Sequence, residues 1–228
     1  MIHSHTSKEF ETELRNLRER LCQMGGKCER QIALAMQALT DRDDEIARKV
    51  IDGDHAIDRD ETEIDELALQ ILATRQPVAS DLRFITMALK FVTDLERIGD
   101  HAAGIAKRVL ELNHVPPLDN APDLRSFAQL VLKNLHAALD AFVARDADAA
   151  MGLIQADREV DKRNASLFAE LLAHVATDPA SVTRVLPLTS VCRYLERIGD
   201  HVKNLAEEVI YMVRAEDLRH RPLPKPKN

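Results

Sequence analysis

The feature that most constrains this chain is a seven-residue run that occurs twice. Residues 95–101 and residues 195–201 both read Leu-Glu-Arg-Ile-Gly-Asp-His. Seven identical residues repeated in a chain of 228 residues are not a coincidence. An internal repeat of this kind indicates that one structural unit is present twice.

The similarity between the two copies extends upstream of the run, at an interval of 103 rather than 100 positions. Asp54 and Asp58 in the first copy correspond to Asp157 and Asp161 in the second. A three-residue deletion between Asp161 and Glu196 explains the change of interval. The repeated unit is therefore about one hundred residues long, which accounts for nearly the whole chain.

The composition favours helices over strands. The chain has only 7 Gly, no Trp and 2 Tyr, while Ala and straight-chain residues, which lose little freedom in a helix, are abundant. Prolines and polar clusters divide each unit into three helices. We expect helices over about residues 7–39, 44–75, 78–115, 122–144, 146–176 and 179–215.

The third helix of each unit carries a narrow apolar stripe with steps of three and four residues, which is typical of helices that pack in bundles. We therefore predict an all-α fold of two three-helix bundles in tandem. The first bundle is expected over residues 1–115, the second over 116–216, and a disordered tail over 217–228. The stripe comprises Phe84, Ala88, Phe91, Leu95, Ile98, Ala102, Ile105, Val109 and Leu112 in the first unit, and Leu188, Val191, Leu195, Ile198, Val202, Leu205, Val209 and Met212 in the second.

The charge and the cysteines exclude several classes of protein. A net charge of −7 argues against nucleic-acid binding, which needs a basic face. No run of eighteen apolar residues exists, so we expect no membrane span. The three cysteines form no Cys-x-x-Cys pair, which favours free thiols in a reducing cytoplasm over a disulfide framework or a zinc ribbon.

Four pairs of carboxylates, each pair separated by four residues, are the candidate functional groups. Such like-charged pairs cost an isolated helix about 0.2–0.5 kcal/mol each, so their repetition in both units indicates a compensating charge. If the second and third helices of each unit are antiparallel, two pairs converge and offer only oxygen ligands, which suit hard cations. The candidate metal ligands are Asp54, Asp58, Glu96 and Asp100 in the first unit, and Asp157, Asp161, Glu196 and Asp200 in the second.

Neighbouring residues leave two interpretations of these pairs open. His101 and His201 are candidates for metal ligands or for residues that support the metal site. Arg97 and Arg197 could instead neutralise the carboxylates as ordinary surface ion pairs. Gly99 and Gly199 lie inside predicted helices, where Gly costs about 1 kcal/mol relative to Ala, so we expect another helix or a ligand to approach closely there.

No signature of an enzyme is found. A di-iron centre of the ferritin type needs Glu-x-x-His on two helices, and only residues 111–114 fit, at a helix end. A glycine-rich phosphate loop, a nucleophile elbow and a zinc-protease motif are all missing from the sequence. We therefore interpret the chain as a regulator or adaptor and not an enzyme.

Two stretches carry a resemblance to a known family. Residues 76–84, Gln-Pro-Val-Ala-Ser-Asp-Leu-Arg-Phe, followed by Asp-Leu-Glu-Arg-Ile-Gly-Asp at 94–100, resemble the first repeat of the PhoU family. Residues 194–201 and 204–211 resemble its second repeat. The resemblance covers nearly the whole chain with the same number and length of repeats.

The resemblance implies a fold with pseudo-twofold symmetry, a homodimer and a cytoplasmic location. It implies a negative regulator of phosphate uptake and of phosphate-starvation signalling. Such a regulator would be an adaptor between the ATPase subunit of a phosphate ABC transporter and a phosphate-sensing histidine kinase, and would meet the membrane only through these partners. The family's metal motif, an acidic residue four positions before Asp, falls on the four carboxylate pairs and implies Fe, Mn, Mg or Zn.

One departure from internal symmetry lies beside these pairs, because Glu61 in the first unit is matched by Asn164 in the second. If both residues help to hold metal, the two sites differ in charge. Three hypotheses remain at this point: a regulatory adaptor, a metal-dependent hydrolase, and a structural helical scaffold.

Overall fold

The computed structural model describes residues 2–218, with the side chains of residues 8–218, and contains six long helices and one 3₁₀ turn. Their bounds are α1 Ile2–Asp41, α2 Asp44–Arg75, α3 Ala79–Asn113, α4 Leu124–Ala144, α5 Ala147–Thr177, η1 Pro179–Ser181 and α6 Val182–Arg214. The all-α fold and its two three-helix units are confirmed. Within residues 2–218 no helix is long and apolar enough to cross a membrane.

The helix boundaries lie where the polar clusters and prolines predicted them. Asp43 caps α2 by accepting hydrogen bonds from the backbone N–H groups of Glu45 and Ile46, and Asp146 caps α5 in the same way. Gln76 ends α2 in the left-handed conformation just before Pro77. Asp178 caps the short η1 turn before α6. The structure differs from prediction at α1, which begins five residues earlier than expected.

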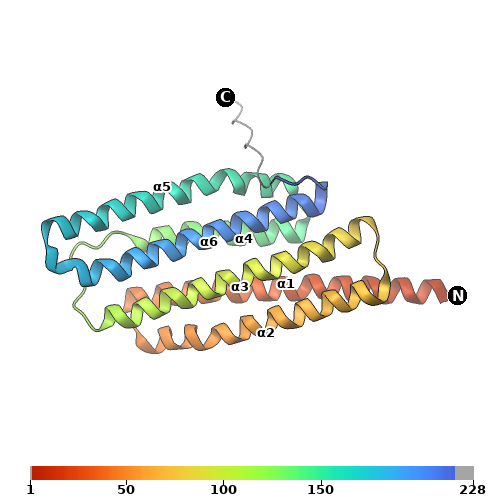
Figure 1. Ribbon diagram of the computed structural model, residues 1–228, viewed down its shortest axis with the longest axis horizontal. Coiled ribbons are helices and arrows are strands. Elements are labelled where there is room, and N and C mark those ends of the chain that lie inside the picture. Colours follow the sequence, from red (N-terminus) through yellow and green to blue (C-terminus); the bar gives the residue numbers. More distant parts are fainter. Residues whose placement is uncertain (1, 219–228) are drawn as a thin grey trace, which may run out of the picture.

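The two units lie side by side along their length (Figure 1). Within each unit the three helices pack against one another, and between the units α3 packs against α6 and α1 packs against α4. Among residues 2–218, helices α2 and α5 make no contact with a helix of the other unit, and they form the two outer edges. Each outer helix therefore meets a central helix, α3 or α6, along a seam that belongs to one unit only.

The apolar stripes predicted for the third helix of each unit form the core. All seventeen stripe residues are buried, and they belong to one hydrophobic cluster shared by both units. Burying a large apolar side chain contributes about 1.5–3 kcal/mol, so this shared cluster holds the two units together as one body. Cys28 and Cys192 are buried free thiols, and Cys22 is a half-buried one.

Residues 219–228, most of the predicted disordered tail, lie outside the described residues. The two described residues that precede them, Asp217 and Leu218, follow the left-handed Ala215 that ends α6. Leu218 packs against the hydrophobic core.

Candidate functional site

The first acidic cluster lies on the seam between α2 and α3 and consists of Asp54, Asp58, Glu61, Glu96 and Asp100. Gly99 brings the two helices together there, because a Cβ atom at this position would lie 2.8 Å from Ile57 Cδ1 and 3.4 Å from Asp54 Oδ1. The close approach that the sequence predicted at Gly99 is therefore made by helix α2. It places the two carboxylate pairs opposite each other.

The carboxylates of the first cluster repel one another in a half-buried place. Burial, followed by the charge of Asp100, raises the pKa of Glu96 to about 7, although the charge of Arg97 opposes the rise. Burial and the charges of Asp100 and Asp58 also raise the pKa of Asp54. Holding these carboxylates close together in a half-buried place therefore costs electrostatic free energy.

The counter-charges of the first cluster come from its surface. Arg97 Nε lies 3.3 Å from Glu96 Oε2 and Arg97 Nη1 lies 3.2 Å from Asp100 Oδ2. His55 Nδ1 lies 3.5 Å from Asp58 Oδ2. Glu96 Oε2 is buried and makes no hydrogen bond, because the approach of Arg97 does not have hydrogen-bond geometry. Arg97 is itself 55% exposed, so its ion pairs are weak ones.

The second acidic cluster lies on the matching seam between α5 and α6 and consists of Asp157, Asp161, Glu196 and Asp200. Gly199 allows the approach of α5, because a Cβ atom there would lie 2.8 Å from Val160 Cγ1. Burial and the neighbouring carboxylates raise the pKa of both Glu196 and Asp200. The structure therefore brings together the predicted acidic residues of each unit.

A lysine makes the second cluster different from the first. Lys203 Nζ donates a hydrogen bond of 2.9 Å to Asp157 Oδ2, and Asp157 is only 6% exposed. The position that corresponds to Lys203 in the first unit is Ala103, which is buried. We did not predict a role for Lys203, although a comparison of the two repeats at an interval of 100 positions reveals the difference.

The two motif histidines lie between the units and face each other. The ring centres of His101 on α3 and His201 on α6 are 5.4 Å apart. His201 Nδ1 lies 2.5 Å from Asp94 Oδ1, whereas the His101 ring lies 5.7 Å from the ring of Tyr194. Burial and the charges of His201 and Arg197 lower the pKa of His101 to about 4.

The surroundings of the histidines follow the internal symmetry but differ in chemistry. Asp94 and Tyr194 occupy corresponding positions, as do Gly104 and Asn204. Asn204 donates a hydrogen bond of 3.0 Å to Asp94 Oδ1, whereas the ring of Tyr194 lies over Gly104, where a Cβ atom would be 2.8 Å from Cζ. Asp94 and Asn204 therefore form a polar cluster with His201, whereas Tyr194 packs over Gly104 and beside the ring of His101.

The fit of these clusters to metal ions depends on chemistry and on placement. In the described part of the chain, no group of three or more His, Cys, Asp or Glu side chains is arranged to hold a metal ion. The donors are nevertheless all carboxylates, as hard cations require, and Glu96 Oε2 is a buried oxygen without a hydrogen bond. The chemistry of the donor set therefore fits a hard cation, whereas its arrangement, with Arg97 paired to Glu96 and Asp100, does not hold one.

Two comparisons define the class of this protein. A family model described as "PhoU domain" matches residues 21–109 and again residues 124–209. The chain is 42% identical over 217 residues to the phosphate-specific transport system accessory protein PhoU homolog of Pseudomonas aeruginosa, with 95% of this chain and 90% of that protein covered. It is 35% identical over 222 residues to the phosphate-specific transport system accessory protein PhoU of Escherichia coli K12, with 96% and 91% covered.

Solved structures show the same fold. The crystal structure of PhoU from Pseudomonas aeruginosa superimposes with a TM-score of 0.88 at 42% identity, covering 91% of this chain and 100% of that one. The crystal structure of the phosphate transport system regulatory protein PhoU from Streptococcus pneumoniae gives 0.85 at 31% identity, covering 91% and 98%. The fold and the doubled seam define a two-repeat helical-bundle protein. The chain belongs to the PhoU family, which confirms the resemblance found in the sequence.

Proposed function

We propose that this protein is an accessory regulator of a phosphate-specific transport system, in which it restrains phosphate uptake and phosphate-starvation signalling. The observation that carries the proposal is the similarity, over nearly the full length of both chains, to relatives named as accessory proteins of that system. One structural relative is named as a regulatory protein, which supports a regulatory role over a catalytic one.

In this proposal the protein is a cytoplasmic homodimer that acts as an adaptor. One partner is the ATPase subunit of the phosphate ABC transporter, and the other is the phosphate-sensing histidine kinase. Two units on one rigid body suit an adaptor, because the shared core fixes the outer surfaces of α2 and α5 relative to each other. Two partners could then be held at a fixed separation.

The two acidic clusters are proposed as sites for divalent or trivalent cations such as Fe, Mn, Mg or Zn. Asp54, Asp58, Glu96 and Asp100 would hold the ion in the first unit, with Glu61 beside them. Asp157, Asp161, Glu196 and Asp200 would hold it in the second, with Asn164 at the place of Glu61. A bound cation would supply the positive charge that offsets the mutual repulsion of these carboxylates, and so stabilise each seam.

Affinity purification from phosphate-replete cells tests the adaptor role. The tagged full-length protein is expected to recover both the transporter ATPase and the sensor kinase, and recovery of neither would contradict the proposal. A starvation reporter in a strain that lacks this protein gives a second readout, because complementation with the wild type should silence it.

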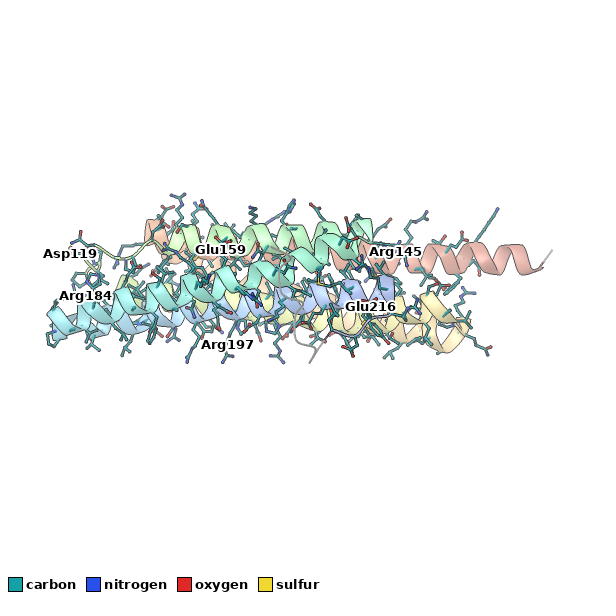
Figure 2. All side chains as sticks on the ribbon, turned by 90° about the horizontal axis from the view of Figure 1, so that it is seen from above. Asp119, Arg145, Glu159, Arg184, Arg197 and Glu216 are labelled. Atoms are coloured by element: carbon teal, nitrogen blue, oxygen red, sulfur yellow. The ribbon has the colours of Figure 1, made fainter. Side chains whose placement is uncertain are left out.

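A pair of variants distinguishes a role of the first acidic cluster from a general effect of surface charge. The double variant Glu96→Gln with Asp100→Asn should lose metal content and weaken repression of the reporter. The control is Asp119→Asn with Glu159→Gln, which changes the charge by the same amount at two exposed positions that belong to neither acidic cluster (Figure 2). If both variants repress as well as the wild type while the first has lost the metal of the first cluster, that metal has no part in regulation.

A further inference from the structure

The two motif histidines form a pair of nitrogen donors between the units. His101 on α3 and His201 on α6 occupy the same position of the repeated run, and their ring centres are 5.4 Å apart. Equivalent residues of two repeats that face each other lie across the internal twofold axis. The pair therefore offers one imidazole from each unit at the contact between α3 and α6.

The spacing of the two rings matches that of two imidazoles bound to one metal ion. A zinc–nitrogen bond is about 2.0–2.1 Å long, and a ring nitrogen lies about 1.2 Å from the centre of its ring. Each ring centre is then about 3.2 Å from the ion, and two rings at the tetrahedral angle have centres about 5.2 Å apart. The observed separation is 5.4 Å, so one ion fits between the rings without a change in the distance between the helices.

The hydrogen bonds of the pair leave nitrogen atoms available for a metal. His201 Nδ1 lies 2.5 Å from Asp94 Oδ1, and Asn204 donates a hydrogen bond of 3.0 Å to the same oxygen. A carboxylate at one ring nitrogen fixes the orientation of the ring and leaves the other nitrogen, here Nε2, as the metal ligand. Within residues 8–218, His101 makes ring contacts with Tyr194 and His201 but no hydrogen bond through its ring nitrogens.

The charges around the pair are mixed and favour a cation slightly. The guanidinium groups of Arg97 and Arg197 act on the pair and disfavour a cation there. Three carboxylates act in the opposite direction, those of Asp94, Asp100 and Asp200. Both arginines are exposed, whereas the Asp94 side chain is only 15% exposed. Solvent therefore screens the repulsion more than it screens the attraction.

We propose that His101 and His201 together bind one borderline divalent cation such as Zn²⁺, at a third site that is separate from the two acidic clusters. Imidazole nitrogens suit Zn²⁺, whereas donor sets made only of oxygen suit Mg²⁺ and Mn²⁺. Two protein ligands leave the remaining positions of the ion to water, so the site is an open one. Because each unit supplies one ligand, the ion joins α3 to α6 and stabilises the contact between the units.

Nitrogen NMR of the full-length protein labelled with ¹⁵N-histidine tests this proposal, because it reports each imidazole nitrogen separately. The protein is titrated with Zn²⁺ in the presence of excess Mg²⁺, which competes for the carboxylate clusters but binds imidazole poorly. We expect Nε2 of His201 and one ring nitrogen of His101 to shift together, with the same dissociation constant. A chelator that removes Zn²⁺ should reverse both shifts.

Variants assign these signals and give a second readout by isothermal titration calorimetry. Loss of a group that orients a metal-binding histidine typically weakens binding about 10–100-fold, so Asp94→Asn should weaken Zn²⁺ binding at least about tenfold. His101→Gln and His201→Gln should each weaken it by more. His136→Gln is the matched control, because this imidazole also has a carboxylate at Nδ1, Glu29 Oε1 at 2.9 Å, but lies on α4 away from the pair. It should leave the affinity unchanged.

Three outcomes would overturn the proposal. Shifts confined to one ring of the pair would show that the two histidines do not share an ion. Shifts at other histidines at lower Zn²⁺ concentration would place the preferred site elsewhere. An affinity that His101→Gln leaves unchanged would exclude this ring as a ligand. If a variant fails to fold, as judged by circular dichroism, the joint shift of both rings in the wild type decides. The adaptor role is tested independently by the affinity purification.

Discussion

The two acidic clusters are built from the same motif on the same pair of helices, yet they carry different charge. The first has five carboxylates, and the cations that act on them include Arg97, an exposed side chain of the motif itself, and the exposed Lys107. The second has Asn164 in place of the fifth carboxylate, and Lys203 forms an ion pair with its buried aspartate. In the second unit a half-buried lysine forms an ion pair with a buried aspartate, whereas in the first the cations that act on the carboxylates are exposed side chains.

This difference shows what a repeated motif does and does not determine. The run Leu-Glu-Arg-Ile-Gly-Asp-His fixes the seam, because Gly99 and Gly199 admit the same residue position of α2 and α5, Ile57 or Val160. Residues outside the run then set the electrostatics of each seam. We infer that the unmatched positions give the two clusters different cation affinities and different responses to pH.

The largest effect is expected when the second cluster is given the charge of the first. Asn164→Glu together with Lys203→Ala adds a carboxylate and removes the lysine. Two unit charges about 7 Å apart interact by about 2.4 kcal/mol at an effective dielectric constant of 20. After screening at a partly exposed site, we expect Mn²⁺ to bind the second cluster at least about tenfold more tightly, measured by isothermal titration calorimetry.

The background for this measurement is Glu96→Gln with Asp100→Asn, so that only the second cluster reports. Lys133→Ala, an exposed lysine on α4, serves as the control for loss of one positive charge at a distance. An affinity that rises equally in the control would mean that net charge alone is responsible. An unchanged affinity in the double variant would show that the clusters are not distinguished by their unmatched residues.

The second effect concerns pH. Burial, followed by the charge of Asp100, raises the pKa of Glu96 from its ordinary 4.5 to about 7 in the folded protein. The folded state therefore favours the protonated form, and its contribution to stability is fully present below pH 4.5 and lost as the pH rises to about 7. The contribution of Glu96 to the unfolding free energy of the wild type should therefore fall over this window.

Glu96→Gln removes this dependence without changing the shape of the side chain. In urea unfolding with a chelator present, the variant should match the wild type near pH 4.5. At pH 8 it should be more stable by about 1–2 kcal/mol, a value reduced for solvent screening. Glu196→Gln should change stability in the same direction by less. A variant that is less stable than the wild type at pH 8 would contradict the direction of the pKa shift.

The sequence predicted the parts of this comparison that depend on periodicity and on local chemistry. The buried stripe, the break at Pro77 and the cap at Asp178 follow from helical spacing and backbone geometry. The convergence of the acidic pairs followed from the assumption that neighbouring helices are antiparallel. Each of these features repeats in both units, and repetition is what made them visible.

The sequence did not predict the residues that act across helices. The pairing of Lys203 with Asp157, and of His201 with Asp94, depends on rotations of α5 and α3 about their axes, which periodicity does not fix. His101 and His201 were proposed as metal ligands or supporting residues. The structure places their rings at the contact between the two units, where they still interact electrostatically with Asp100 and Asp200. The contact between α3 and α6 joins residues about one hundred positions apart in the sequence. The spacing of residues within one repeat therefore does not predict which side chains meet there.

The third prediction compares the contributions of Asp94 and Tyr194, which occupy corresponding positions, to the unfolding free energy. Asp94→Asn removes the charge that accepts from His201 and Asn204, and hydrogen bonds of this kind contribute about 1–2 kcal/mol. We expect that loss in the unfolding free energy at neutral pH. Tyr194→Phe keeps the ring over Gly104 and should change stability by less than about 0.5 kcal/mol. An equal loss in the two variants would show that Tyr194 also acts through its hydroxyl group.

The smallest effect distinguishes two arginines that end helices in the same way. Arg42 and Arg145 occupy corresponding positions, with φ values of 55° and 54°. A left-handed conformation costs a residue with a side chain about 1–2 kcal/mol, part of which Gly recovers. Arg145→Gly should therefore raise the unfolding free energy by about 0.5 kcal/mol.

Arg42→Gly should have the opposite sign, because Arg42 has a second role. Its guanidinium donates hydrogen bonds of 2.8 and 2.6 Å to the carbonyls of Leu112 and Val115, which hold the end of α3 against the start of α2. Losing these charged bonds outweighs the relief of backbone strain, so we expect a net loss of about 1 kcal/mol in urea unfolding. If both glycine variants are stabilised, the side chain of Arg42 contributes nothing, and the two units end their first helices identically.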